Sequence, residues 1–305
     1  MLLPSRKTTT TSLSARSADA GPLQFFIMKL TLGHSPDADD AFMFYAMAKN
    51  LVNLRGHEFT HILQDIETLN RRCQANELDI SAVSFHAYTR IADQYALLPC
   101  GASFGDGYGP CLVAKKKIDR ETMKTKRIGI PGLLTSAYLT LQLYLGLPHG
   151  SFEAVNLPFD KIQEEILSGR VDAGIIIHEG QLTYQDEGFK LCEDLGTWWA
   201  KDTGGLPLPL GGNVVRRDLG PEVIASVTET LRESVHYALD HRQAGVRHAL
   251  PLSRGMDEKR TDKFIGMYVN DLTLDFGDRG RAGLKEFFGR AHKFGLIPKI
   301  PCFGS

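Results

Sequence analysis

The 305-residue sequence has few cysteines, no excess of charge of either sign and no long apolar run. Its five cysteines are scattered and form no CxxC pair, which argues against a disulfide framework or a cysteine-rich zinc site and fits a reducing compartment. Lysine and arginine number 35 against 36 aspartates and glutamates, so the charge favours neither nucleic acid nor an anionic membrane as a partner. No apolar run approaches the roughly 20 residues of a bilayer-spanning helix. A cytoplasmic enzyme and a small-molecule binder remain.

The composition, 43% hydrophobic and 23% charged, is that of a soluble globular protein, and the length favours two domains. Residues 1–27 differ from the rest because they are rich in threonine and serine and poor in acidic residues. We expect them to form a disordered N-terminal extension, with Met28 as the start of the functional chain. A transit peptide is the alternative, whereas a secretory signal lacks its continuous apolar segment.

From residue 29 the chain alternates short apolar runs with amphipathic stretches, which is typical of an α/β fold. We expect strands over residues 29–32, 59–63, 80–83, 97–99, 127–130 and 171–177, the last as a central parallel strand. Helices are expected over residues 41–49, 67–76, 86–93, 135–145 and 158–168. The last of them is expected to place Phe159, Ile162, Ile166 and Leu167 on one apolar face. In the last third, two amphipathic helices are expected to point their apolar residues inward: Val223, Val227, Leu231 and Val235 in one, Leu284, Phe287, Phe288 and Ala291 in the other.

Residues 75–84 and 168–177 echo each other as a helix end, a polar turn, an aspartate and a strand. Each strand leads into a polar cluster, Ser84 and His86 in the first case and His178 and Glu179 in the second. Because open α/β sheets bind ligands beyond the carboxyl ends of their strands, we expect these clusters to face each other across one cleft. Chance similarity is the alternative.

His178 is the candidate catalytic residue, because it stands where a buried strand emerges. A histidine there titrates near neutrality and is placed to act as a general base. The alternative is a histidine that only hydrogen-bonds a loop.

Thr135, Ser136 and Ala137 begin a helix directly after a Pro-Gly turn. The free N–H groups and the positive end of the helix dipole suit a carboxylate or phosphate. A simple N-cap is the alternative, and Ser84 could add a hydroxyl from the opposite side.

Two further motifs are interpreted without a ligand. Residues 33–40 (GHSPDADD) combine one histidine with three aspartates, but Asp39 and Asp40 are stabilised by the helix start itself, so we expect no metal site. Residues 101–109 (GASFGDGYG) match neither GxGxxG nor a P-loop. We expect this segment to be a flexible loop where the chain crosses between lobes.

Four segments are specific enough to indicate a family: residues 33–45 (GHSPDADDAFMFY), 67–70 (ETLN), 177–184 (IHEGQLTY) and 205–211 (GLPLPLG). They resemble 1,4-dihydroxy-6-naphthoate synthase, the lyase of the futalosine pathway of menaquinone biosynthesis. The resemblance covers about residues 28–295, essentially the whole chain after the extension. The His-Glu motif with its following tyrosine is its most specific part.

The resemblance implies a two-lobed fold like the type II periplasmic binding proteins, with a ligand cleft between the lobes. We expect residues 28–112 plus 213–305 in lobe 1 and residues 113–212 in lobe 2. The implied reaction converts cyclic dehypoxanthine futalosine to 1,4-dihydroxy-6-naphthoate and a sugar-derived fragment, without a metal or redox cofactor. The base of the family matches His178, and its substrate contacts match residues Ala82, Val83, Ser84, Thr135, Ser136 and Ala137.

One position departs from the family, since its members carry lysine where this chain has Ala82. The helix dipole at Thr135 then has to hold more of the substrate's negative charge. Chorismate dehydratase, of the same pathway and fold type, is the nearest alternative, and a non-catalytic solute-binding protein is an alternative of another class. The expected partner is a small molecule, with no nucleic acid and no membrane, and the oligomeric state stays open.

Overall fold

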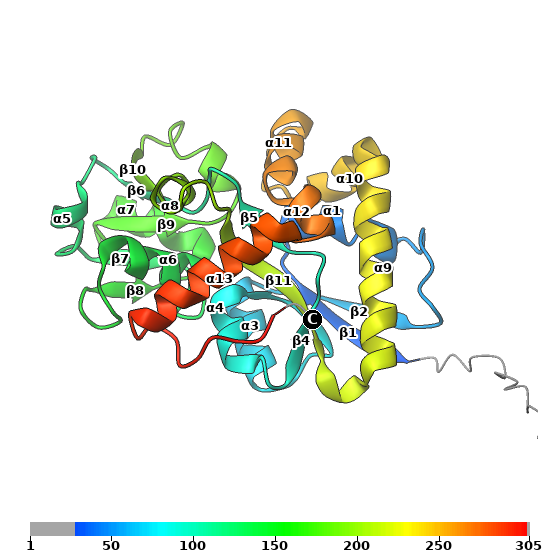
Figure 1. Ribbon diagram of the computed structural model, residues 1–305. Helices are drawn as coiled ribbons and strands as arrows, with labels where there is room; N and C mark the ends of the chain where they lie inside the picture. The colour runs from blue at the N-terminus through cyan, green and yellow to red at the C-terminus, as the bar shows by residue number, and fades with distance from the viewer. Residues whose placement is uncertain (1–27, 304–305) are drawn as a thin grey trace, which may run out of the picture.

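The computed structural model describes residues 28–303. The extension predicted over residues 1–27 lies outside them. Figure 1 shows two groups of strands side by side, each surrounded by helices, with the long helix α9 at the edge of one group. In the part of the chain that is described, every helix is too short or too polar to traverse a bilayer.

The first sheet has the strand order β2-β1-β3-β11-β4, with β5 paired to β11. Strands β1, β2 and β3 run parallel to one another, whereas β11 is antiparallel to all three of its partners. Parallel strands place their carboxyl ends at one edge, which is where such sheets bind ligands. The bounds are β1 (Lys29–His34), β2 (Glu58–Leu63), β3 (Ile80–Ser84), β4 (Tyr95–Leu97), β5 (Ser103–Gly105) and β11 (Leu208–Arg216).

The second sheet has the order β10-β6-β9-β7-β8. Strand β9 pairs parallel with β7 but antiparallel with β6, so the sheet is mixed. The predicted central strand is therefore central, but it is parallel on one side only. The bounds are β6 (Cys111–Ala114), β7 (Ile128–Ile130), β8 (Ala154–Asn156), β9 (Ala173–Ile176) and β10 (Lys190–Asp194).

The chain passes from the first sheet to the second between β5 and β6, and it returns before β11. The glycine-rich residues 101–109 lie at the first of these crossings, as expected, but they also contain β5, which pairs with β11. The predicted lobe boundaries, at residues 112/113 and 212/213, fall inside β6 and β11. The boundaries themselves stay a prediction.

Apolar side chains cover both faces of the first sheet, because neighbouring strand residues point to opposite sides. Val215 belongs to one apolar layer and Val214 to the other. The first layer includes side chains of α1 (Ala38–Met43), α2 (Tyr45–Ala48), α9 (Pro221–Asp240), α10 (Arg242–Ala249), η4 (Leu250–Leu252) and α11 (Glu258–Tyr268). The second includes side chains of α3 (Ile66–Gln74), α4 (Phe85–Ile91) and α13 (Gly277–Lys293). The short segment η3 (Arg217–Leu219) joins β11 to α9, and α12 (Asp271–Leu274) lies between α11 and α13.

The second sheet is covered in the same way. Tyr138 and Leu141 of α6 belong to one layer, and Ile162 and Ile166 of α7 belong to the other. The bounds of the remaining helices are α5 (Arg120–Met123), α6 (Ser136–Leu145), η1 (Phe159–Lys161), α7 (Ile162–Ser168), η2 (Glu179–Leu182) and α8 (Leu195–Thr203). Helix α13 packs on β11 and also touches α6, so it links the two sheets.

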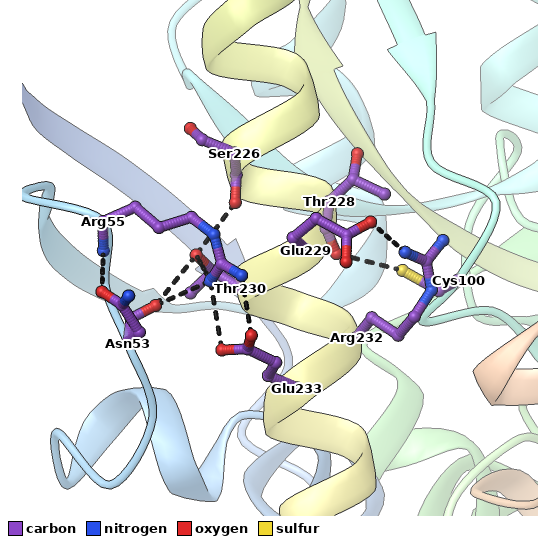
Figure 2. A network of polar contacts seen from close by, with 9 residues as sticks. All are labelled: Asn53, Arg55, Cys100, Ser226, Thr228, Glu229, Thr230, Arg232 and Glu233. Atoms are coloured by element: carbon purple, nitrogen blue, oxygen red, sulfur yellow. Dashed lines mark hydrogen bonds and ion pairs between the residues drawn. The ribbon is translucent and has the colours of Figure 1, made fainter. Parts of the chain in front are cut away.

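Arg55, in the loop before β2, connects this loop to helix α9 (Figure 2). Its guanidinium contacts Glu233 Oε1 at 2.7 Å and donates to Thr230 Oγ1 at 3.1 Å. Arg55 also donates to the carbonyl of Asn53 at 2.8 Å. These contacts connect α9 to the loop before β2, and both belong to the part of the chain built around the first sheet.

Most predicted elements are confirmed within a residue or two, and the inward positions of α13 are all buried. Three details were wrong. The helix expected over residues 41–49 is interrupted at Phe44, which ends α1 and precedes α2. The strand expected over residues 97–99 ends at Leu97. Leu167, placed on the buried face of α7, is 56% exposed, because Gly169 ends the helix just after it.

Candidate active site

A cavity lies where strand ends of the two sheets meet. About 780 Å³ of space lies between its lining atoms, the open mouth included. The lining includes the end of β3, part of β11, and the segments that follow β1, β7 and β9. All of the predicted substrate-binding residues line it: Ala82, Val83, Ser84, Thr135, Ser136 and Ala137.

One wall of the cavity is the N-terminus of α6, and it offers hydrogen-bond donors. Thr135 is the N-cap, as predicted: its Oγ1 accepts from Tyr138 N at 3.2 Å and donates to the carbonyl of Gly132 at 2.8 Å. Within residues 28–303 the N–H groups of Ser136 and Ala137 have no backbone or side-chain acceptor. Free N–H groups at the positive end of a helix dipole suit an anion, so this wall fits a carboxylate.

Helix α3 of the first sheet holds this wall in place. Leu134 N donates to Glu67 Oε2 at 3.1 Å, and Asn70 bonds both the N–H of Ser84 at 2.9 Å and its hydroxyl at 3.2 Å. A Cβ at Gly132 would lie 2.3 Å from Glu67 Oε2, so only glycine allows this close approach. The contacts fix Ser84 and the start of α6 relative to each other.

The cavity lining also includes the carboxylates of Asp37, Asp39 and Asp40, which together are called the acidic wall. Asp40 Oδ2 accepts from Ser35 N at 2.6 Å, and burial raises the pKa of Asp40 to about 6. Burial, followed by the charges of its acidic neighbours, raises the pKa of Asp39 well above its usual value. The expectation that Asp39 and Asp40 only charge a helix start was incomplete, because α1 begins at the cavity and both carboxylates line it.

The candidate base, His178, directly precedes η2 and is buried. Ile177 before it and Gln181 after it line the cavity, whereas His178 itself is not among the lining residues. Its Nδ1 accepts from Gly180 N at 3.0 Å, so the neutral ring carries its proton on Nε2. That atom has no partner among residues 28–303. Burial and then the charge of Arg254 lower the pKa of His178 to about 4.

His86, expected across the cleft from His178, instead faces the start of α6. Its backbone N donates to Ser136 Oγ at 3.3 Å, and its Nδ1 lies 3.3 Å from the carbonyl of Thr135. Burial lowers the pKa of His86 to about 4. It is absent from the lining, so it supports the donor wall rather than contacting a ligand.

Sequence reasoning missed Arg254 and Tyr268. Arg254 lies between η4 and α11, pairs with Asp37 Oδ1 at 2.6 Å and also with Glu179. Its guanidinium lies 4.9 Å from the centre of the Phe159 ring. Tyr268 of α11 lines the cavity and donates its hydroxyl to Gln181 Oε1. Neither residue belongs to a motif, and both reach the site through contacts with η2, Arg254 with Glu179 and Tyr268 with Gln181.

Ala82 lies at the cavity beside β11, where its register partner is Asn213. Asn213 also lines the cavity and donates to the carbonyl of Gly101 at 2.7 Å. The side chain that faces Ala82 across the pair is therefore neutral. Over residues 28–303 no group of three or more histidines, cysteines or acidic residues is arranged to hold a metal ion.

Comparison with solved structures defines the class of fold. The alkanesulfonate-binding protein of Xanthomonas axonopodis pv. citri superposes with a TM-score of 0.66 at 13% identity, covering 90% of this chain and 95% of that one. A Candida albicans protein with the generic periplasmic-binding-protein fold gives 0.64 at 14% identity, covering 89% of this chain and 91% of that one. The chain therefore has a periplasmic-binding-protein-like fold, as the resemblance implied.

Closer relatives define the family. The chain belongs to the menaquinone-biosynthesis family, whose family model matches residues 30–293. Two relatives are each named 1,4-dihydroxy-6-naphtoate synthase: one from Thermus thermophilus is 35% identical over 89% of this chain and 97% of its own, and one from Streptomyces coelicolor is 34% identical over 89% and 95%. A solved structure from Archaeoglobus fulgidus is 44% identical with a TM-score of 0.83, covering 88% of this chain and 98% of that one. The resemblance predicted from the four segments is confirmed.

Proposed function

We propose that this protein is a 1,4-dihydroxy-6-naphthoate synthase, a carbon–carbon lyase that acts on cyclic dehypoxanthine futalosine. Its family and the names of its two relatives support the product. The observation that supports the proposed substrate is the lining of the cavity. It has hydrogen-bond donors at Ser136 and Ala137 and acceptors at Asp37, Asp39 and Asp40. A substrate with a carboxylate at one end and sugar hydroxyls at the other matches both walls.

In this proposal the substrate carboxylate lies at the start of α6. The N–H groups of Ser136 and Ala137 and the hydroxyl of Ser84 hold it, with the helix dipole in place of a lysine. The hydroxyls of the sugar-derived part donate to the aspartates. Fixing both ends places the bond to be broken between the walls, and such positioning removes much of the barrier.

His178 is the general base of the proposed reaction. Its low pKa keeps the ring neutral at pH 7, and Nδ1 is the nitrogen that lacks a proton. Nδ1 must therefore exchange the N–H of Gly180 for the substrate proton. The electron pair left on the substrate drives cleavage of the bond to the sugar-derived fragment, and aromatisation of the remaining ring supplies the driving force. The step needs no metal or redox cofactor, and we place it in the cytoplasm.

Product formation tests this function. Purified protein is mixed with cyclic dehypoxanthine futalosine, and mass spectrometry and absorbance follow 1,4-dihydroxy-6-naphthoate. We expect product from the wild type and a loss of about 10²–10⁴-fold in kcat for His178→Ala, with Arg55→Met as the distant control. Saturable binding without product would identify a binding protein, and water loss from chorismate would identify the dehydratase. Near-normal kcat in His178→Ala would remove the base assignment alone.

A further inference from the structure

Arg254 is a charged residue that connects both sides of the site without lining the cavity. It follows η4 in the helical layer of the first sheet, with a left-handed φ of 49°. It pairs with Asp37, just after β1, and with Glu179, which follows His178. Its face covers Phe159, whose ring meets the His178 imidazole edge-on at 5.5 Å between centres. Each partner of Arg254 therefore belongs to the surroundings of the site: Glu179 is next to His178 in the sequence, Phe159 contacts its ring, and Asp37 is part of the acidic wall.

We propose that Arg254 is a positioning residue: its guanidinium binds both Glu179 and, across the cleft, Asp37, and thereby holds the Glu179 carboxylate away from the His178 imidazole. This inference rests on the proposed function for its meaning in catalysis. The effect of Arg254 on the ionisation of His178 can be tested without any substrate.

The position of Glu179 makes this control possible. Its Oε2 lies 4.0 Å from His178 Nδ1 and is held by Arg254. Its Oε1 is buried and has no partner among residues 28–303. Without Arg254, the histidine ring would be the nearest group able to become a cation beside Glu179. A direct carboxylate–histidine pair favours the charged imidazolium, which cannot accept a further proton.

Charged groups reach His178 from each neighbouring segment. Arg254 opposes the imidazolium, whereas Asp37 after β1 and Asp160 in η1 favour it. Glu179 stands on the same segment, with its own pKa raised by burial and by Asp37, against the opposing effect of Arg254. Burial is the largest contribution to the low pKa of His178, and Arg254 is the next. Removal of Arg254 therefore acts twice in one direction, since it deletes a cation and releases an anion.

A purely structural latch is the competing explanation, because Arg254 joins segments that belong to the two sheets. A latch would alter stability or cleft closure but would leave the ionisation of His178 unchanged. The titration of the histidine ring separates the two roles.

The first experiment follows the His178 ring signal by NMR from pH 8 downward in the full chain. His178→Ala assigns the signal, and Arg254→Met is compared with the wild type. We expect the pKa of His178 to rise by about one unit in Arg254→Met, as for loss of a nearby like charge. Arg55→Met is the matched control, because Arg55 also has a left-handed φ and also pairs with a glutamate. It should leave the signal unchanged, and an unchanged pKa in Arg254→Met overturns the proposal.

A conservative variant covers the case in which Arg254→Met does not fold. Arg254→Lys keeps the cation but has only one ammonium group to share between Glu179 and Asp37. We expect the pKa of His178 in Arg254→Lys to rise by about one-half unit, which is less than in the methionine variant. A wild-type titration curve in a folded Arg254→Lys, combined with a failure of Arg254→Met to fold, would assign Arg254 to stability and overturn the proposal.

The second experiment measures kcat/KM against pH with cyclic dehypoxanthine futalosine. In Arg254→Met the acidic limb should move upward by the same amount as the ring titration, with partial recovery in Arg254→Lys. A shifted ring titration in a protein without product formation would keep the role of Arg254 and reject the proposed function. Product formation without a shift in the ring titration or in the acidic limb would keep the proposed function and reject the role of Arg254.

Discussion

Arg55 and Arg254 both stand at left-handed backbone positions, with φ of 52° and 49°, and both hold a glutamate. Their surroundings differ. The Glu233 side chain paired with Arg55 is 44% exposed, whereas the Glu179 side chain paired with Arg254 is 3% exposed. The hydrogen bond from Arg55 lowers the pKa of Glu233. Burial raises the pKa of Glu179 in spite of Arg254.

The difference shows that one type of ion pair serves two purposes according to burial. Near water the pair adds a modest attraction between neighbouring elements, as Figure 2 shows for α9. In the interior the same groups have lost their hydration, so each charge depends on its partner and shifts the ionisation of what lies beside it. Arg55 for this reason only stabilises the contact between α9 and the loop before β2, whereas Arg254 also affects the ionisation of His178.

Removing the glutamate from each pair gives the largest expected contrast. We expect Glu179→Ala to lower the free energy of unfolding by roughly 2–3 kcal/mol, at or below the low end for a broken buried pair, because Arg254 keeps Asp37. Glu233→Ala should lower it by less than about 1 kcal/mol. Urea denaturation at pH 7.5 measures both, and equal losses would show that burial does not distinguish the pairs.

The pH dependence of stability gives the next largest effect, a change of about 1 kcal/mol in the free energy of unfolding. A shift of one pKa unit corresponds to about 1.4 kcal/mol when it is fully expressed. In the folded chain the pKa of His178 is about 4 against 6.5 for the free residue. The unfolded chain therefore binds the proton first, and the folded protein loses stability as the pH falls from 6.5 toward 4. Arg254→Met raises the folded pKa by about one unit. Its deficit in the free energy of unfolding relative to the wild type should therefore stay constant down to about pH 5.5 and narrow by about 1 kcal/mol as the pH falls further toward 4.

Arg55→Met should behave differently in the same titration. Its partner Glu233 has a folded pKa below the ordinary 4.5, so the pair contributes stability above that pH and loses it only below. The deficit of Arg55→Met should therefore stay constant from pH 7.5 to 5 and narrow under more acidic conditions. Urea midpoints at intervals of half a pH unit measure both deficits, and parallel curves for the two variants would contradict the assignment.

Arg260 provides the smallest expected effect. It lies on α11, near Arg254, and pairs with Asp186 at 3.3 Å, but both side chains are more than half exposed. We expect Arg260→Gln to change the free energy of unfolding by no more than about 0.5 kcal/mol and to leave the His178 titration where it is. A larger change in either measurement would mean that reaching across the cleft, rather than burial, gives Arg254 its role.

Local features of the site could be predicted from the sequence. Thr135 caps α6 because a threonine after a Pro-Gly turn satisfies the first N–H groups of the helix that follows. Residues at the ends of apolar runs, such as Ser84, lie at the cavity because parallel strands end at the same edge. Each of these predictions depends on interactions within a few residues or on a general rule of α/β sheets.

Other features could not be predicted in this way. Strand β9 is apolar throughout, and such a run does not reveal whether a neighbour is parallel or antiparallel. The interruption at Phe44 divides a segment whose pattern reads as one helix. Asp39 follows the rule for a helix start, but its burial beside two more carboxylates depends on the closing of the cavity around it.

The sequence by itself determined the α/β class, the family, the cap of α6 and the strand-end position of His178, because each follows from neighbouring residues or from motifs. Only the tertiary structure decided that His178 stays beside the cavity and that Arg254 reaches it from a segment 76 positions later in the chain. Ionisation depends on burial and on charges within a few ångströms, and those distances exist only after distant segments have packed together.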